Sequence, residues 1–300
     1  MKIAYFGLPL GALLLAADGH APPLVVLSPV EALGRRRLRD QVPRLVDAAD
    51  AGDDLEQQVA DALAQLEPDL LVSWFWTRKL PQAWLEQPPL GAIGVHPSRL
   101  PRHRGPNPYF WSIDAGDAET GVTLHRLNAE YDTGQILDTR SLAIGERDAW
   151  QLARALDRPS LAILRAGVDR LARGEAFDEL AQDERLATWA PEPTAEALKV
   201  DFGWATERVL QRIRALSPTP GVALEVEGVA LFVTRAERAT SFVAALLPGE
   251  AHLSDALTLR TSDGAITVTR AFFPETERET EAEASSKDAV LLLLKRRGRP

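Results

Sequence analysis

The stretch GAIGVHPSRLPRHRGPNPYFWSIDAGDAETGVTLHRLNAEYDTGQIL, residues 91–137, decides how this chain folds and where its chemistry lies. Its apolar start, Gly91–Val95, is typical of a buried strand. Repeated prolines and a glycine then break the backbone over Pro97–Pro108, so a loop must follow the strand. The alternating segment Gly121–Leu127 predicts a second strand. Because α/β proteins place their chemistry on loops at strand ends, we expect the functional site here.

Three histidines in this stretch, His96, His103 and His125, raise the question of a metal site. Their spacing matches no familiar set of ligands, and the chain has neither cysteine nor a His-Glu-x-x-His motif. His103 also stands between two arginines, which disfavour a bound cation. We therefore predict no metal. The chain also lacks a Gly-x-Gly-x-x-Gly phosphate loop and a Ser-His-Asp hydrolase elbow.

The composition is that of an ordinary globular protein. The 300 residues suit one large domain or two modest ones, with 45% hydrophobic and 26% charged residues. A net charge of −9 argues against a general nucleic-acid coat, although it leaves room for a local basic groove. The absence of cysteine excludes disulfides, thiolate nucleophiles and cysteine-ligated metal sites.

The N-terminus fits two interpretations, a secretory signal or a first strand and helix. Gly7 and Pro9 interrupt the apolar stretch Ile3–Ala17 early, which favours a strand, a turn and a helix. A further strand over Leu24–Leu27 would complete a parallel βαβ unit. We therefore predict a cytoplasmic protein. No other apolar run approaches the ~20 residues of a membrane span, so we predict no membrane contact.

Two elements precede the central stretch. Asp53–Leu66 has the apolar spacing of an amphipathic helix, and Asp53 is placed to cap it. Leu70–Trp76 is predicted to be a buried strand whose alternation puts Trp74 and Trp76 on one face. Two interpretations of Trp76 stay open: it lies in the core, or it lines a pocket for a flat heterocycle.

The segment Glu31–Val46 carries four clustered arginines, Arg35, Arg36, Arg37 and Arg39. Gly34 and Pro43 keep any helix here short. The cluster is either a solvated face or a phosphate-binding patch.

Two helices are expected after the central stretch, Ala149–Leu156 and Ser160–Leu171, separated by Pro159. Gly174–Thr188 is polar and predicted to be irregular. Pro191-Glu192-Pro193 marks a linker. A helix over Thr206–Leu216 then precedes short alternating strands, which are Val222–Val226, Val229–Thr234, Ala256–Thr261 and Ala265–Arg270.

The predicted fold is therefore an α/β domain followed by a small β domain. We place a mostly parallel, twisted sheet flanked by helices in residues 1–188, a linker in 189–203 and an OB-like β-barrel in 204–300. The charged run Glu275–Glu283 is expected to be solvated, and Ala289–Leu294 is expected to pack on the barrel.

Ordered motifs in the central stretch carry a resemblance to a known family. They are His96, Ser98-Arg99-Leu100-Pro101, Arg104-Gly105, Glu119-Thr120-Gly121-Val122-Thr123 and Asp132-Thr133-Gly134. In this order they resemble the 10-formyltetrahydrofolate-dependent formyltransferases, most closely the methionyl-tRNA formyltransferases. The segment Arg214–Pro220 is similar to the second domain of that family, so the resemblance covers nearly the whole chain.

The resemblance implies an enzyme that moves a formyl group from 10-formyltetrahydrofolate to an amine. Such a transfer needs a proton carrier, a donor to the developing oxyanion and a group that orients both. By their positions in the family pattern, His96 is the proton carrier and Asp132 its orienting partner. The implied folate contacts are Trp76, Arg78, Lys79, Leu80, Tyr131 and Asp132, and the implied substrate contacts are Ser98, Arg104 and Asn107. From the residues alone, two roles stay open for Arg104 and Asn107: each either contacts the substrate or anchors the loop.

One position departs from the pattern, because Gly94 stands where the family has a catalytic asparagine. Losing one oxyanion donor typically costs about 10²–10³ in rate. Three interpretations stay open. Asn107, Ser98 or a water replaces the donor, the reaction is slow or its acceptor unusual, or the chain binds folate or tRNA without turnover.

The acceptor is an amine, and two classes stay open. The second domain suggests charged initiator tRNA. The acidic balance, and a segment near the arginine cluster shorter than the family's basic insertion, suggest a small amine or an amino-sugar nucleotide. Nothing in the sequence indicates an obligate protein partner.

Overall fold

The computed structural model describes residues 1–226, 228–272 and 294–295 of the chain. The chain divides into two compact units that alternate along the sequence. Unit 1 comprises Met1–Pro108, Thr120–Ala143 and Ala155–Ala190, and unit 2 comprises Tyr109–Glu119, Ile144–Arg154 and the described residues from Pro191 onward. The predicted domain limits, 1–188, 189–203 and 204–300, stay predictions.

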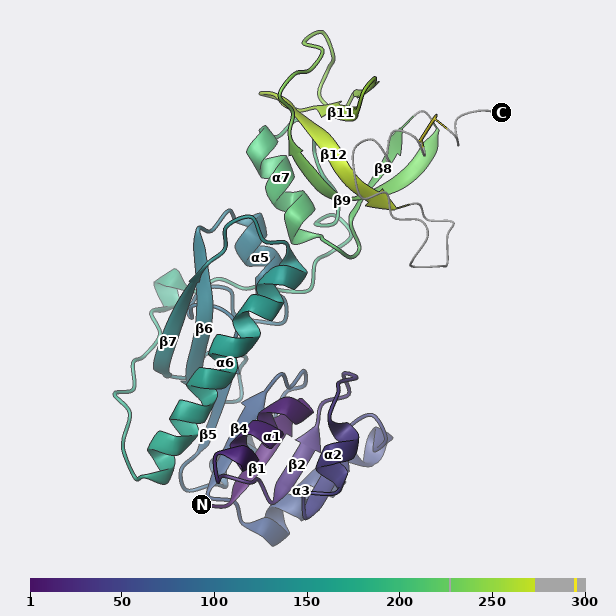
Figure 1. Ribbon diagram of the computed structural model, residues 1–300. Helices are drawn as coiled ribbons and strands as arrows, with labels where there is room; N and C mark the ends of the chain where they lie inside the picture. The colour runs from purple at the N-terminus through teal and green to yellow at the C-terminus, as the bar shows by residue number, and fades with distance from the viewer. Residues whose placement is uncertain (227, 273–293, 296–300) are drawn as a thin grey trace. The chain divides into compact units, whose positions relative to one another are not determined.

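Unit 1 is built on a seven-stranded sheet with the order β3-β2-β1-β4-β5-β6-β7 (Figure 1). The strands are β1 (Ile3–Gly7), β2 (Leu24–Leu27), β3 (Arg44–Asp47), β4 (Leu70–Trp74), β5 (Ala92–His96), β6 (Glu119–Arg126) and β7 (Ile136–Ala143). β3, β2, β1, β4 and β5 run parallel, and β6 is antiparallel to β5. The prediction of a mostly parallel α/β sheet is confirmed.

Helices cover both faces of this sheet. They are α1 (Pro9–Ala17), α2 (Arg35–Arg39), α3 (Leu55–Leu66), α4 (Gln82–Glu86) and α6 (Ala149–Ala172), with short 3₁₀ turns η1 (Gly52–Asp54) and η2 (Glu184–Leu186). α3 packs with Phe6 and the other residues of that face into one apolar cluster. Tyr5 points to the opposite face, where its ring lies against Gly11 of α1. The alternation along β1 thus supplies both layers of the core.

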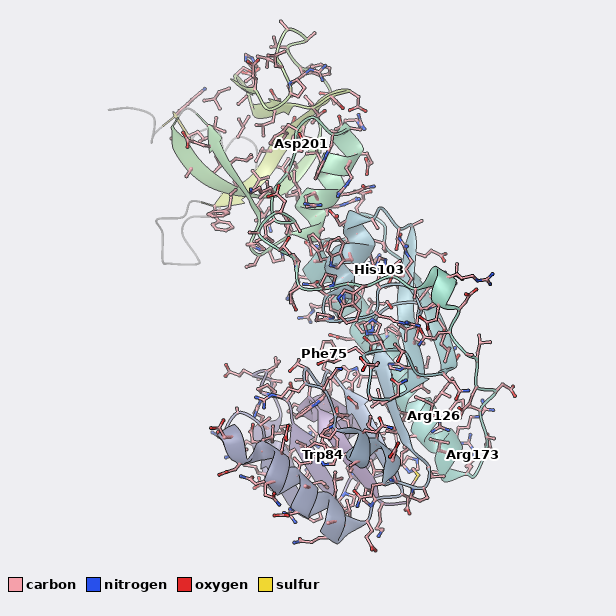
Figure 2. All side chains as sticks on the ribbon, turned by 180° about the vertical axis from the view of Figure 1, so that it is seen from behind. Phe75, Trp84, His103, Arg126, Arg173 and Asp201 are labelled. Carbon is pink, nitrogen blue, oxygen red and sulfur yellow. The ribbon has the colours of Figure 1, made fainter. Side chains whose placement is uncertain are left out.

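Trp74 and Trp76 do not share a face, so this prediction is wrong. β4 ends at Trp74, and Phe75, labelled in Figure 2, has a left-handed φ of 58° that breaks the strand alternation. Trp74 therefore donates its indole N–H to the hydroxyl of Ser160 in α6 at 2.8 Å. Trp76 instead packs edge-on against Phe6, within the cluster under α3.

The prediction of two helices separated by Pro159 is also wrong, because α6 is continuous from Ala149 to Ala172. A proline inside a helix removes one hydrogen bond and costs about 3 kcal/mol or more. Leu156 and Leu164, on either side of Pro159, are both buried. Burial of this apolar face on the sheet offsets the cost.

Two smaller predictions before the central stretch also need correction. Asp53 does not cap α3, because it lies inside η1 and the residue that precedes α3 is Asp54, whose side chain makes no cap hydrogen bond. The arginine-rich segment contains the edge strand β3 as well as the short α2. The strand was missed because Leu45 and Val46 are its only apolar residues.

Unit 2 contains an antiparallel sheet with the order β10-β11-β12-β9-β8 (Figure 1). Its elements are α5 (Pro108–Asp114), α7 (Thr206–Ala215), β8 (Val222–Val226), β9 (Val229–Arg238), β10 (Ala251–Leu253), β11 (Leu257–Arg260) and β12 (Ala265–Phe272). The curled sheet agrees with the predicted OB-like domain, although β10 was not predicted.

A buried ion-pair cluster joins α5 to α7 within unit 2. Asp114 accepts hydrogen bonds from Arg208 at 2.7 and 2.8 Å, and Arg212 also donates to both oxygens of this carboxylate. Arg212 also donates to the carbonyls of Ala197 and Lys199. Asp114 and Arg212 are both buried, so each depends on the other for its charge to be compensated.

Two predictions concern residues outside the described part of the chain. They are the solvated run Glu275–Glu283 and most of the segment Ala289–Leu294. Within the described residues, the structure has no helix of the length and apolar character that a membrane span requires.

Candidate active site

The candidate site forms where β5 ends at His96. The neighbouring strand β6 holds the first part of the loop that follows β5. Thr123 of β6 is fully buried. Its hydroxyl donates to the carbonyl of Ser98 at 2.7 Å and accepts from the backbone N–H of Leu100 at 3.1 Å. One side chain thus sets the path of the loop directly after the strand.

The far part of the same loop pairs with residues 188–190. Arg104 donates its backbone N–H to Thr188 at 2.9 Å, and its carbonyl accepts from Ala190 at 2.6 Å. Asn107 donates its backbone N–H to the carbonyl of Ala190 at 3.0 Å. The predicted loop is therefore held by backbone hydrogen bonds of the kind that pair strands.

His96 and Asp132 come together, as the sequence predicts, with Nδ1 of His96 3.3 Å from Oδ2 of Asp132. Gly105 donates its backbone N–H to the same oxygen at 2.8 Å. Asp132 has a left-handed φ of 57°, which turns its carboxylate back toward the loop. The turn needs Gly134, because a Cβ there would lie 1.9 Å from the carbonyl oxygen of Arg126.

Both ring nitrogens of His96 face acceptors. Nε2 lies 2.7 Å from the backbone carbonyl of His103 and must donate to it, since a carbonyl only accepts. Nδ1 faces the carboxylate of Asp132. In the neutral ring the lone pair of Nδ1 therefore faces that carboxylate.

His125 is a second buried imidazole on Asp132, and the sequence reasoning missed it as a site residue. Its Nε2 is 3.7 Å from Oδ1, the carboxylate oxygen that His96 does not face. Its Nδ1 donates to the carbonyl of Arg126 at 2.8 Å. Burial lowers the pKa of His125, and nearby Asp132 opposes that shift. His125 is also the register partner of Gly94, so both positions face the same side of the sheet. The alternation of β6 could have revealed this.

Arg104 is buried, and its guanidinium is fully engaged within unit 1. It donates to Gln182 at 2.8 and 3.0 Å and to Glu184 at 2.7 and 2.9 Å. Arg104 holds the pKa of the Glu184 carboxyl below its usual value. Gln182 in turn donates to the backbone carbonyls of Asp132 and Gly134 at 2.8 and 2.7 Å. This chain of bonds holds the Asp132 turn, and nothing in the irregular sequence around Gln182 signalled it.

The other two predicted substrate residues lie on the same loop. Ser98 is fully buried and donates its hydroxyl to the carbonyl of Arg102 at 2.6 Å. Asn107 is half-buried at the start of the segment that leads into α5. Substrate contact by Ser98, Arg104 and Asn107 stays a prediction.

The place of the absent asparagine is filled by an apolar side chain. A Cβ built on Gly94 would lie 2.8 Å from Cδ2 of Leu127, the residue after β6. Leu127 packs on the same apolar cluster as Trp76. Position 94 is therefore covered by a side chain from the neighbouring strand.

The predicted folate contacts divide between the loop after β4 and the Asp132 turn. Trp76 has a buried indole N–H with no hydrogen-bond partner in the described structure. Arg78 and Lys79 are exposed, and Leu80 packs on the cluster under α3. The ammonium of Lys79 lies over the ring of Tyr131, 5.4 Å from its centroid. Lys79 and Tyr131 thus connect the two segments.

An exposed aromatic pair borders the site, and the sequence reasoning missed one of its members. The rings of Tyr131 and Trp189 have centroids 6.4 Å apart. Tyr131 is 41% exposed and Trp189 53% exposed, large values for aromatic side chains. The edge of Trp189 also lies against Gly105, whose N–H holds Asp132. These rings therefore border the loop and the turn that hold the His96–Asp132 pair.

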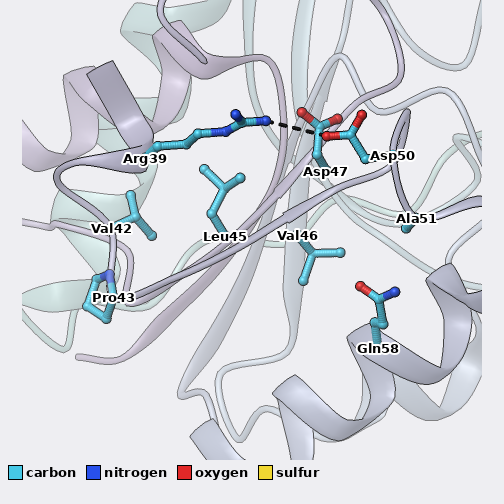
Figure 3. Close-up of a pocket in the computed structure, with 9 residues that line it drawn as sticks. All are labelled: Arg39, Val42, Pro43, Leu45, Val46, Asp47, Asp50, Ala51 and Gln58. Atoms are coloured by element: carbon cyan, nitrogen blue, oxygen red, sulfur yellow. Dashed lines mark hydrogen bonds and ion pairs between the residues drawn. The ribbon is translucent and has the colours of Figure 1, made fainter. Parts of the chain in front are cut away.

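A separate polar hollow lies beside β3 and α2 in unit 1 (Figure 3). Arg39 and Asp50 line it and pair at 3.4 Å. Arg35 of the same cluster is held by Asp47 and by carbonyls of the β2–α2 loop. None of the predicted site residues lines this hollow. Within the described residues, no group of histidine, aspartate and glutamate side chains could hold a metal ion.

Comparisons with known proteins place this geometry in context. Two family models match: "Formyl transferase" over residues 21–159 and "Formyl transferase, C-terminal domain" over residues 194–285. The methionyl-tRNA formyltransferase of Rhizorhabdus wittichii is 32% identical over 281 residues, which are 90% of this chain and 90% of that protein.

Solved structures share the fold at lower identity. HypX from Aquifex aeolicus in complex with tetrahydrofolic acid has a TM-score of 0.64 and 23% identity, and the match covers 97% of this chain but only 47% of HypX. An N-formyltransferase from Helicobacter canadensis, in complex with folinic acid and dTDP-3-aminofucose, has a TM-score of 0.67 and 16% identity over 89% of this chain and 98% of that one.

Proposed function

Because this chain belongs to the formyl transferase family, we propose that it formylates the amino group of methionyl initiator tRNA, with His96 and Asp132 as its catalytic residues. The enzyme transfers a formyl group from 10-formyltetrahydrofolate to an amine acceptor. The observation that supports the catalytic assignment is the His96–Asp132 contact, held by the N–H of Gly105.

The residues present fit a folate donor. Trp76 offers a buried indole N–H without a partner in the described structure, and such a donor is costly unless a ligand accepts from it. The loop Trp76–Leu80 and Tyr131 would hold the folate. When bound, 10-formyltetrahydrofolate supplies the formyl group.

In this proposal the chain's own residues carry and orient the proton. His96 is 6% exposed, donates from Nε2 to the carbonyl of His103 and turns Nδ1 to Asp132, so its ring is oriented in advance for proton transfer. Asp132 keeps the imidazole oriented, and the N–H of Gly105 keeps Asp132 oriented. Such preorganised acid–base groups typically contribute about 10²–10⁴ in rate.

One feature supports a nucleic-acid acceptor. In unit 1 the exposed pair Tyr131 and Trp189 offers a surface on which a base can stack, and such stacking is worth about 1–3 kcal/mol per base.

Transfer of a labelled formyl group from 10-formyltetrahydrofolate to methionyl initiator tRNA tests the proposal. The competing acceptor is a dTDP-linked amino sugar. We expect transfer to tRNA with kcat/KM at least ~100-fold higher, a margin of about 2.7 kcal/mol. Faster transfer to the amino sugar would overturn the tRNA assignment. No transfer to either would overturn the catalytic assignment, and would leave a folate- or tRNA-binding relative.

A further inference from the structure

One carboxylate stands between two buried imidazoles in unit 1. Oδ2 of Asp132 faces Nδ1 of His96 at 3.3 Å, and Oδ1 faces Nε2 of His125 at 3.7 Å. The second contact is longer than a hydrogen bond, and a small movement of the Asp132 side chain would close it. Nothing in the proposed transfer so far uses His125.

The hydrogen bonds fix which nitrogen of each ring carries a proton. Nε2 of His96 and Nδ1 of His125 each donate to a backbone carbonyl. In their neutral forms, both rings therefore turn a lone pair toward the same carboxylate. A proton that reaches the carboxylate can therefore be shared with either ring.

His125 is the member of the trio that burial leaves neutral at rest, so its Nε2 is free to take up that proton. The charged or titratable groups that face it are Asp132 on its turn, His96 on β5 and Arg104 on the loop. Burial lowers its pKa, so the ring is neutral at rest and its Nε2 lone pair is available. Its side chain is 2% exposed, so it reaches the acceptor only through Asp132.

We propose that His125 is a positioning residue that receives, through Asp132, the proton which the acceptor amine must lose before it attacks. This proposal rests on the proposed transfer to an amine and deepens it. Because position 94 is a glycine, no side chain from the register partner of His125 competes for the carboxylate.

The proposed step is limited to deprotonation of an ammonium group. An α-amino group has a pKa of about 7.7–8.0, so much of the acceptor arrives protonated at neutral pH. One N–H bond of the ammonium breaks, its electron pair stays on nitrogen, and the proton passes to Asp132. The new O–H bond then breaks as Nε2 of His125 takes the proton. The products are a neutral amine and an imidazolium beside a carboxylate, so atoms and charge balance.

Two substitutions separate this role from packing. In His125→Asn the amide can keep the donor to Arg126 while the group at Nε2 is deleted. In His125→Gln an amide stands near the place of Nε2 but takes up no proton. His20→Gln is the matched control, since His20 lies 3.4 Å from Asp169 elsewhere in unit 1.

The readout is kcat/KM against pH with the full-length enzyme and methionyl initiator tRNA. We expect both His125 variants to lose about 10- to 100-fold near pH 6.5 and to approach wild type near pH 9, where the acceptor amine is already neutral. The His20 variant should follow wild type throughout. A loss that is the same at every pH, or no loss, would overturn the proposal.

A second measurement does not depend on the acceptor. Nitrogen-15 spectra of the five histidines in full-length wild type report the proton on each ring nitrogen. We expect His125 to carry its proton on Nδ1 near neutral pH, and Asp132→Asn to change its titration. A His125 ring that does not respond to Asp132→Asn would overturn the proposal even if tRNA proves the wrong acceptor.

Discussion

Leu127 stands over Gly94, with its Cδ2 atom 2.8 Å from where a Cβ at position 94 would lie. An asparagine at position 94 would require the side chain of Leu127 to move, because that contact is shorter than real Cβ contacts. The effect of restoring the asparagine therefore depends on Leu127, and a test that changes both residues separates the two.

We expect Gly94→Asn alone to lower the free energy of unfolding by about 1–3 kcal/mol, as overpacking does in a well-packed core. Gly94→Asn with Leu127→Ala should recover part of that loss, because the smaller side chain makes room. Urea unfolding of the two variants and of Leu127→Ala alone measures the coupling. If the effects of the two single substitutions simply add in the double variant, the leucine does not occupy this space.

The double variant Gly94→Asn with Leu127→Ala also tests whether the wild type lacks an oxyanion donor. We expect the kcat of the double variant to exceed that of Leu127→Ala by less than about tenfold, because another group already donates to the oxyanion in the wild type. A gain of about 10²–10³, the usual value of one such donor, would show instead that the wild type is catalytically impaired.

Asp132→Asn should lower kcat by about 10²–10⁴ with little change in thermal stability. The amide still accepts from Gly105 but cannot balance a charged imidazole. Asp169→Asn is the matched control, since Asp169 lies beside His20 at nearly the same separation. We expect that control to keep wild-type activity. A comparable loss in both variants would remove the catalytic assignment of Asp132.

Trp189→Ala should raise KM for methionyl initiator tRNA by about tenfold, within the 1–3 kcal/mol that base stacking supplies. Trp150→Ala is the control, because Trp150 is 55% exposed, close to the 53% of Trp189. Steady-state kinetics with each substrate varied in turn distinguishes the partners. A rise confined to the folate KM would assign the ring to the donor instead.

Asp114→Ala should lower the free energy of unfolding by about 3–5 kcal/mol, because it leaves the buried guanidinium of Arg212 without a counter-charge. Glu196→Ala, which removes an exposed partner of Lys199, should leave stability unchanged. Chemical denaturation of both variants gives the comparison. A similar, small effect for the two would show that the Asp114 cluster contributes no more than a surface pair.

Stability should fall on acidification partly because of His125. Its pKa is lowered in the folded protein by burial, so the unfolded chain binds the proton more readily. The resulting stability is present above the ordinary histidine pKa of about 6.5 and is lost as pH falls through the lower folded value. Between about pH 7.5 and 5.5, wild type should therefore lose more stability than His125→Gln. Parallel denaturation curves at the two pH values decide this.

The strands that could be predicted from the sequence are those with an apolar or alternating pattern over several consecutive residues. β4, β5 and β6 are apolar or alternating over several residues, and the glycines and prolines after β5 mark the loop that carries the site. The pairing of His96 with Asp132 was implied by the family pattern that both residues match, and no local pattern required it.

The features that the sequence did not predict depend on contacts between residues that lie far apart in the chain. A single left-handed residue, Phe75, reversed the face of Trp76, and no local pattern requires it. Pro159 is tolerated inside α6 because of what the helix packs against. Gln182 and Trp189 lie in an irregular segment that acquires its structure only by pairing with the loop around Arg104.

The cluster of Asp114, Arg208 and Arg212 also limits where the gene for this protein can recombine. The carboxylate is encoded before residues 189–203, and the two arginines that neutralise it are encoded after them. A recombination event in that segment would therefore separate a buried charge from its partners. A chimera joined there should be stable only if the incoming helix supplies arginines at both places.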